Sequence, residues 1–207
     1  MSADHPVDTD PSNAEVSQIV QWVALAQSGD RSAFHRLADR YQAEIFRMIF
    51  YRVRTKMDAE DLTQEVFFKA FRSIKQLRSP QRFKSWLYRI AVNRVRDFQR
   101  RNAFKSIFGF IALDDPDIHE PEEMAAAPEA AEHIERQAFW RQITEMLSAL
   151  SKMEKEIFLL RFLDGLTIGE ITTVMKKNES TVKTHLYRAL AKMKGAAARM
   201  DLSMEDL

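Results

Sequence analysis

The stretch FKSWLYRIAVNRVRDFQRR, residues 83–101, combines six Lys or Arg with eight large apolar side chains. At 3.6 residues per turn, one face of a helix here carries Leu87, Ala91, Val95 and Phe98. A second face carries Arg89, Asn93, Arg96 and Arg100, and Trp86 lies one turn before Arg89. The spacing predicts a helix with one side in a core and a positively charged, hydrogen-bonding side toward a partner.

The chemistry of the second face favours nucleic acid whose bases are unpaired. Arg guanidinium groups pair with phosphates, and an unpaired base stacks on a Trp ring. The amide of Asn93 can read a base edge. Two other interpretations stay open at this point: Trp86 as a core residue beside solvated arginines, and a basic amphipathic helix lying on a membrane surface.

The rest of the chain also predicts helices. It has only five glycines and no sustained apolar/polar alternation, so the fold class is all-α. Helices are expected at 15–27, from Asp30 or Ser32 onward, and after a cap at Asp58. The apolar positions of these helices recur at helical spacing and predict one core.

A second motif, LTIGEITTVMKKNESTVKTHLYRALAKMK at residues 166–194, has helix-turn-helix spacing. Asn178 is expected to cap the second helix, whose inner side holds Val182, Leu186 and Met193. The outer side shows Ser180, Thr181, Lys183, Thr184, Tyr187 and Arg188, which suit phosphates and the major groove. The turn lacks glycine, so Lys177 or Asn178 is expected to be strained. A plain helical hairpin is the alternative.

Charge divides the chain into segments. Residues 16–112 carry nineteen Lys or Arg against eight acids, and residues 136–200 carry twelve against six. Residues 113–135 carry nine acids and no Lys or Arg, with prolines that interrupt helices. We predict two small helical domains, 15–112 and 136–200, joined by an acidic linker at 113–135, with tails at 1–14 and 201–207. Residues 102–113 are apolar and are expected to close the first core, with a docking surface for the second domain or for an inhibitor as the alternative.

Several functional classes are disfavoured. The absence of cysteine removes disulfides, thiolate metal sites and a cysteine nucleophile. The five histidines form no metal-ligand pair, so no metal, cofactor or catalytic group is predicted and the chain is not expected to be an enzyme. No apolar run is long enough for stable membrane insertion, and the acidic N-terminus is unlike a signal peptide, so a cytoplasmic protein is expected.

The segments 29–49, 58–74, 83–101 and 147–194 together resemble the extracytoplasmic-function group of bacterial sigma-70 factors. The WLYRIAVN string and the pairing of both domains carry the resemblance. It implies a σ2-like helical bundle and a σ4-like helix-turn-helix domain, which bind core RNA polymerase and promoter DNA in a stress or envelope response. An anti-sigma factor is a further implied partner, and it can hold such proteins near the inner membrane.

The resemblance also implies roles for particular residues. Contacts to the β′ clamp of polymerase are expected from Asp61, Gln64, Glu65 and Phe68. Contacts to the single-stranded −10 element are expected from Leu77, Phe83, Trp86, Arg89, Asn93, Arg96 and Arg100. Contacts to the −35 element are expected from Ser180, Thr181, Lys183, Thr184, His185 and Arg188, with the β subunit as a further partner. The loop RSPQR, residues 78–82, departs from the family's glycine-containing form.

The alternative function is a two-domain helix-turn-helix regulator that does not bind polymerase as a sigma subunit. That hypothesis predicts a ligand pocket in the first domain, which the arginines of residues 83–101 disfavour. Binding to core polymerase separates the two.

Overall fold

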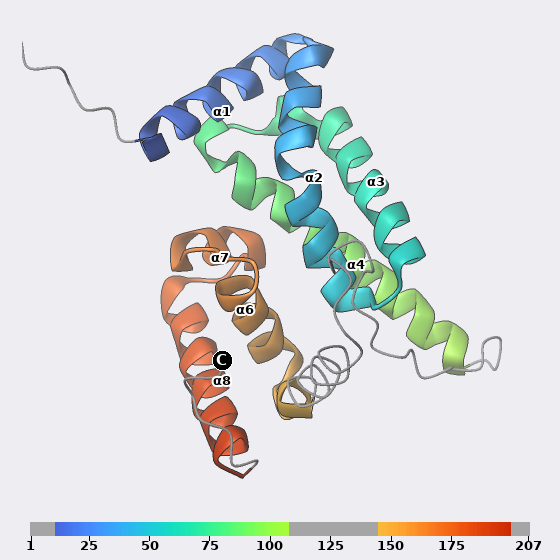
Figure 1. Cartoon of the computed structure of the whole chain (residues 1–207), viewed down its shortest axis with the longest axis vertical. Helices are drawn as coiled ribbons and strands as arrows, with labels where there is room; N and C mark the ends of the chain where they lie inside the picture. Colours follow the sequence, from blue (N-terminus) through green and yellow to red (C-terminus); the bar gives the residue numbers. More distant parts are fainter. Residues whose placement is uncertain (1–10, 108–144, 200–207) are drawn as a thin grey trace, which may run out of the picture.

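The computed structural model describes the backbone of residues 11–107 and 145–199 and the side chains of residues 14–103 and 145–196. Within these residues the secondary structure is helical, with no strand (Figure 1). The helices are α1 (Pro11–Ser28), α2 (Arg31–Val53), α3 (Lys56–Ser73), η1 (Ile74–Gln76), η2 (Pro80–Arg82), α4 (Phe83–Ile107), α6 (Lys152–Phe162), α7 (Ile168–Met175) and α8 (Glu179–Arg199). The predicted linker and residues 108–113 lie outside the described residues.

Side-chain caps set the helix starts. Asp30 accepts hydrogen bonds from the backbone N–H groups of Ser32 and Ala33, at 2.8 and 3.2 Å, as expected for the cap of α2. The predicted cap at Asp58 is wrong, because Thr55 caps α3 and accepts from the Asp58 N–H. Asp58 lies in the first turn instead, where a carboxylate is favourable near the positive end of the helix dipole.

The core of the first unit joins α2, α3 and α4. Leu37 and Ile45 of α2, Val66 of α3, and Leu87 and Val95 of α4 are each at most 1% exposed. The predicted apolar face of residues 83–101 is therefore confirmed, since Ala91 is also fully buried and Phe98 is partly buried. Burial of each large aliphatic side chain contributes about 1.5–3 kcal/mol relative to exposure.

The second unit consists of α6, α7 and α8. Capping boxes start α6 at Ser151 with Glu154 and α7 at Thr167 with Glu170. Asn178 Oδ1 accepts from the Thr181 N–H at 2.8 Å, which confirms the predicted cap of α8. The strained position in the glycine-free turn is Lys176, with φ of 52°, and not the predicted Lys177 or Asn178.

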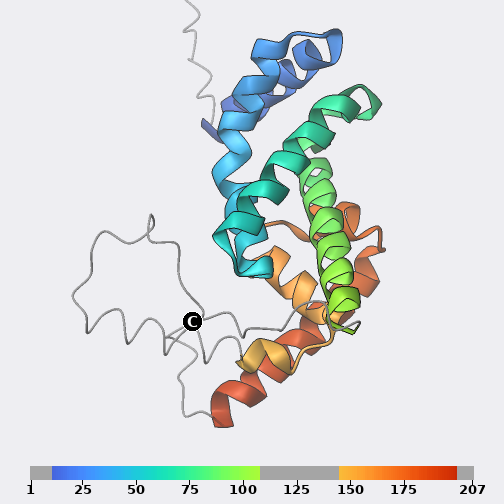
Figure 2. The same cartoon turned by 90° about the vertical axis from the view of Figure 1, so that its right-hand side faces the viewer.

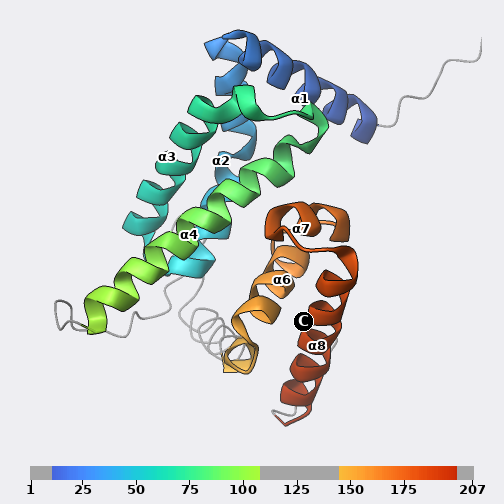
Figure 3. The ribbon, with the colours of Figure 1, turned by 180° about the vertical axis from the view of Figure 1, so that it is seen from behind.

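The two units pack against each other. Figures 1 and 3 show α7 beside α4, and one continuous apolar cluster includes residues of both units. Figure 2 shows α1 and the C-terminal part of α8 at opposite ends of the molecule. The two predicted domains share a core, for which the sequence contains no local signal.

No helix in the described ranges is long and apolar enough to cross a bilayer.

Candidate nucleic-acid and polymerase interface

The polar face of α4 is built as the helical spacing predicts. Asn93, Arg96 and Arg100 are exposed and Arg89 is half-buried. Arg100 Nη2 donates to Asp97 Oδ1 at 3.0 Å, and Arg96 Nη2 lies 3.3 Å from Met175 Sδ of α7. In the described parts of the chain, Arg89 and Asn93 make no side-chain hydrogen bond or ion pair. This face therefore offers guanidinium and amide donors to a ligand.

Trp86 lies at the buried edge of this face. Its side chain is part of a residue only 8% exposed, and its ring centroid is 5.8 Å from that of Phe83. Phe83 is 1% exposed, and its ring lies 5.5 Å from Tyr41 of α2. Burial raises the pKa of the Tyr41 hydroxyl to about 12. Trp86 is thus one end of a packed aromatic row, and little of the residue is exposed to solvent.

The loop before α4 is tied to α1 by one side chain. Gln27 Nε2 donates to the carbonyl oxygens of Ile74 and Leu77, at 3.0 and 2.7 Å. Leu77 is 9% exposed, whereas Arg78, Gln81 and Arg82 in the loop are exposed. No sequence pattern predicts this role for Gln27, because its partners are backbone groups 47 and 50 positions away.

The outer side of α3 brings together the four residues predicted to contact polymerase. Asp61, Gln64 and Glu65 are exposed, and Phe68 is 62% exposed with the Arg72 guanidinium 5.4 Å from its ring centroid. Glu65 forms an ion pair with Arg94 of α4. An exposed aromatic ring among carboxylates is a typical protein-contact surface.

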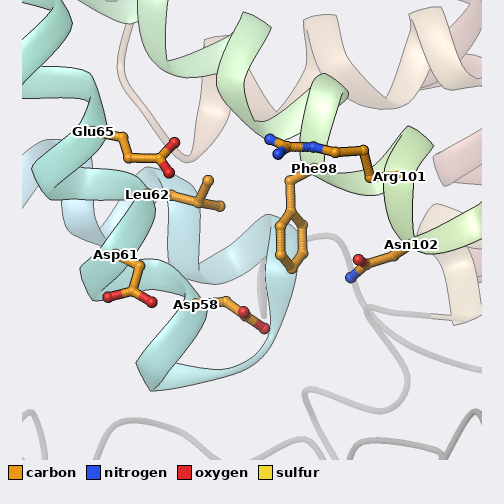
Figure 4. Close-up of a pocket in the computed structure, with 7 residues that line it drawn as sticks. All are labelled: Asp58, Asp61, Leu62, Glu65, Phe98, Arg101 and Asn102. Carbon is orange, nitrogen blue, oxygen red and sulfur yellow. The ribbon is translucent and has the colours of Figure 1, made fainter. Parts of the chain in front are cut away.

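A pocket of about 200 Å³ lies between α3 and α4 (Figure 4). Asp58, Asp61 and Glu65 approach it from α3, and Arg101 and Asn102 approach it from α4. Leu62 and Phe98 form its apolar floor. Among the described residues no group of three or more potential ligands is arranged to hold a metal ion. The pocket extends the acidic surface of α3 toward α4.

The outer side of α8 presents most of the residues predicted for duplex DNA. Ser180, Lys183, Thr184 and Arg188 are exposed, and Thr181 is half-buried. Lys183 Nζ pairs with Glu179 Oε1 at 2.6 Å, and this hydrogen bond raises the pKa of Lys183. These residues and the capped N-terminus of α8 together present hydrogen-bonding and positively charged groups on the outer side of the helix.

His185 and Tyr187 complete the outer side of α8, and only His185 is more buried than predicted. His185 is half-buried, and its Nδ1 is buried with no hydrogen-bond partner among the described residues. Tyr187 is 66% exposed next to Arg188, as the helical spacing predicted for the outer side of this helix. A tyrosine exposed to this extent on the outer face extends the surface available to a duplex.

Comparisons with known proteins agree with this architecture. Residues 37–105 match the family Sigma-70 region 2, and residues 140–193 match Sigma-70, region 4. The chain is 33% identical over 181 residues to the ECF RNA polymerase sigma factor BldN of Streptomyces coelicolor, which covers 86% of this chain and 65% of BldN. It is 33% identical over 167 residues to the RNA polymerase sigma factor SigV of Bacillus subtilis, covering 81% of this chain and 89% of SigV. It is 31% identical over 177 residues to the ECF RNA polymerase sigma-E factor of Escherichia coli, covering 81% of this chain and 87% of the sigma-E factor.

Solved structures show the same fold. CnrH, in complex with the cytosolic domain of CnrY, has a TM-score of 0.63 at 21% identity, covering 88% of this chain and 98% of that chain. The sigma factor RpoE of Bartonella quintana, in complex with the anti-sigma factor NepR, has a TM-score of 0.61 at 16% identity, covering 80% of this chain and 96% of that chain. The order of the two matched regions and the identity to SigV and sigma-E, across most of their lengths, settle the family. This chain belongs to the extracytoplasmic-function sigma factors of the sigma-70 family.

Proposed function

We propose that this chain binds core RNA polymerase as its promoter-recognition subunit and directs initiation at promoters with −10 and −35 elements. The observation that carries the proposal is the presence of two separate DNA-suited surfaces on one chain. One is the polar face of α4, and the other is the outer side of α8. An acidic protein-contact surface on α3 accompanies them.

The −10 element binds as a single strand on α4 in this proposal. Arg89, Arg96 and Arg100 neutralise phosphates, and Asn93 hydrogen-bonds a base edge. Leu77, Phe83 and Trp86 support the loop at residues 78–82, because all three are buried. Only a rearrangement that exposes the Trp86 ring would let a base stack on it.

The −35 element binds as duplex against α8. Ser180, Thr181, Thr184 and His185 face the groove, while Lys183 and Arg188 contact phosphate or guanine. Glu179 already holds Lys183 in an ion pair, so DNA must compete for that ammonium group. The N-terminus of α8 adds attraction for phosphate.

Core polymerase docks on α3, with Asp61, Gln64, Glu65 and Phe68 facing the β′ clamp and the second unit facing the β subunit. The chain acts without chemistry of its own, as a cytoplasmic subunit serving a stress or envelope response. An anti-sigma factor is a proposed regulator, because CnrH and the Bartonella RpoE are similar folds solved with CnrY and NepR. The units at 15–112 and 136–200 are its functional domains.

In vitro transcription with purified core polymerase tests this function. We expect the full chain to co-elute with core and to produce transcripts with defined starts from genomic DNA fragments. The regulator hypothesis predicts duplex binding by the chain alone, with no core association and no new start sites. That outcome would overturn the proposal.

A further inference from the structure

The first turn of α8 carries a carboxylate on a helix that is otherwise basic. Residues 179–199 hold one acid, Glu179, against five Lys or Arg. The Glu179 side chain is 61% exposed, and its Oε1 lies 2.6 Å from Nζ of Lys183, whose side chain is 48% exposed. An acid in the first turn and an ion pair one turn apart each stabilise a helix slightly. Here, however, the carboxylate also neutralises a cation on a surface suited to a polyanion.

The position of Glu179 is one from which base edges are read. In helix-turn-helix proteins the second helix enters the major groove with its N-terminal residues at the bases. Glu179 and Ser180 follow directly on the Asn178 cap in the first turn of α8, and both are exposed. Lys183 lies one turn later and is tied to Glu179. The ion pair therefore belongs to the part of α8 that meets bases.

The neighbouring hydroxyl groups have already used their protons. Ser180 Oγ donates to Asn178 Oδ1 at 3.0 Å, and Thr184 Oγ1 donates to the Ser180 carbonyl oxygen at 2.8 Å. A hydroxyl has a single proton, so both groups present only lone pairs to DNA. An ammonium group has three donors, and the ion pair uses one of those of Lys183. Glu179 is thus the charged acceptor of this turn, and Lys183 is its donor.

A G·C base pair has the pattern complementary to this ion pair. In the major groove it presents the N7 and O6 acceptors of guanine beside the N4 amino donor of cytosine. The two remaining donors of Lys183 match N7 and O6, and a free lone pair of the Glu179 carboxylate accepts from N4. The ion pair is kept in this arrangement. A G·C pair therefore does not compete for the ammonium group, as a phosphate does.

An A·T base pair lacks this complementarity. It presents an acceptor, a donor and an acceptor in order, with O4 of thymine where cytosine would offer its amino group. A carboxylate that faces O4 meets a negative partial charge and no proton, and Lys183 loses one acceptor. The same carboxylate repels phosphates, whose contacts carry no sequence information. Glu179 thus adds repulsion against the wrong partners as well as attraction to one base pair.

We infer that Glu179 and Lys183 together read one G·C base pair of the duplex element, with Glu179 accepting from cytosine and Lys183 donating to guanine. The inference rests on the proposed function and deepens it, because it names a specificity-determining residue and the base that this residue selects.

Selection from a duplex library tests this assignment. The probe is a promoter fragment randomised over the −35 element, which is bound by the full chain alone or by its complex with core polymerase and then sequenced. Glu179→Gln keeps the size of the side chain and removes its charge, and the new amide can also donate to thymine O4. Lys183→Met keeps most of the side-chain length without the ammonium group. Glu145→Gln, at an exposed position of the same unit outside α8, is the matched control.

The unmodified chain and the control should select a G·C pair at one position of the element. Glu179→Gln and Lys183→Met should each reduce this preference by about five- to one-hundredfold, at that same position, with helicity by circular dichroism unchanged. A uniform gain in affinity of Glu179→Gln for all duplexes, with base preference retained, would overturn the inference and leave Glu179 as a repulsive charge. Changes at different positions in the two variants, or no G·C preference in the unmodified chain, would also overturn it.

The two forms of the protein separate this inference from the proposed function. Failure of core polymerase to bind the chain refutes the proposed function, while selection by the chain alone still decides the base pair. Where only the complex selects a sequence, the preference of the complex decides. A transcribing complex whose G·C preference is insensitive to both substitutions overturns the inference and leaves the proposed function intact.

Discussion

Lys192 Nζ of α8 donates to Glu154 Oε2 at 2.7 Å, so the first turn of α6 is held to the middle of α8 by one ion pair. Glu154 also accepts from the Ser151 backbone N–H at 2.8 Å as half of a capping box. Its side chain is 6% exposed. One carboxylate therefore caps α6 and aligns α8, the proposed reader of duplex DNA.

These contacts predict an acid-dependent stability. The Lys192 hydrogen bond, followed by the Ser151 backbone bond, lowers the pKa of Glu154 from its ordinary value of 4.5 to about 2. A carboxyl with a depressed folded pKa stabilises the fold above its unfolded pKa and loses that contribution as pH falls toward the folded value. Denaturant unfolding followed by circular dichroism should show stability falling between about pH 4.5 and pH 2.

The substitution Glu154→Gln should flatten this pH dependence and lower stability at pH 7. Glu145→Gln, an exposed carboxyl of the same unit, is the control and should leave both unchanged. If Glu154→Gln unfolds with the same acid profile as the unmodified chain, another carboxyl is responsible.

Gln27→Ala tests whether the loop at residues 78–82 is held from α1. It removes two hydrogen bonds to the Ile74 and Leu77 carbonyls and should lower stability by about 1–3 kcal/mol. Because the loop is then free to shift, base preference at the −10 element should broaden in transcription from a library of −10 variants. Gln21→Ala, an exposed change on the same helix, should alter neither quantity. A loss of stability with unchanged base preference would make Gln27 structural only.

The sequence predicted the local features of this fold and missed the long-range ones, for identifiable reasons. The buried face of α4 follows from spacing alone, since Leu87, Ala91 and Val95 recur with the helical period. Thr55 and Asp58 are both good caps three positions apart, so the pattern could not separate them. Lys176 was missed because no glycine marks the left-handed position.

No local pattern in the sequence predicts the contact between the two units. Arg52 donates hydrogen bonds to Glu156 and Asp164, which lie 104 and 112 positions later in the sequence, beyond the segment predicted as a linker. Periodicity describes one helix at a time and does not say which charged residue another domain will bury. The same limit applies to two of the proposed DNA contacts. Asn93 is exposed, as the helical spacing predicted, whereas Trp86 is buried because it packs against Phe83.

Trp86→Ala should destabilise the fold, because it deletes a large side chain from a residue that is 8% exposed. We expect a loss of about 3–5 kcal/mol in the free energy of unfolding, measured by urea denaturation. Trp86→Phe fills much of the same space and should retain most of that stability. If Trp86→Ala unfolds like the unmodified chain but loses single-strand affinity of about 1–3 kcal/mol, the ring stacks on a base and is not a core residue.

Asn93→Ala should weaken DNA binding and leave stability nearly unchanged, the reverse of the result expected for Trp86→Ala. The side chain is exposed, so stability should change by no more than about 0.5 kcal/mol. Binding of a −10 single strand by the holoenzyme should weaken by about 1–3 kcal/mol if the amide reads a base edge. Asn102→Ala, an exposed substitution on the same helix, is the control and should leave single-strand binding unchanged. Both variants are measured at saturating core polymerase, so that only DNA binding is compared. Equal affinity for the two variants would remove Asn93 from the proposed interface.

Arg188→Ala tests the duplex surface of α8 through its salt dependence. The residue is exposed and makes no ion pair with another described side chain, so its charge is available to a phosphate. Loss of one phosphate contact should reduce the slope of log K against log salt concentration by about 0.9, nearly equally for different duplex sequences. Lys152→Ala, an exposed cation at the start of α6, should leave the slope unchanged. A loss of affinity confined to one duplex sequence, with an unchanged slope, would instead assign Arg188 to a base, because a base contact releases no counterion.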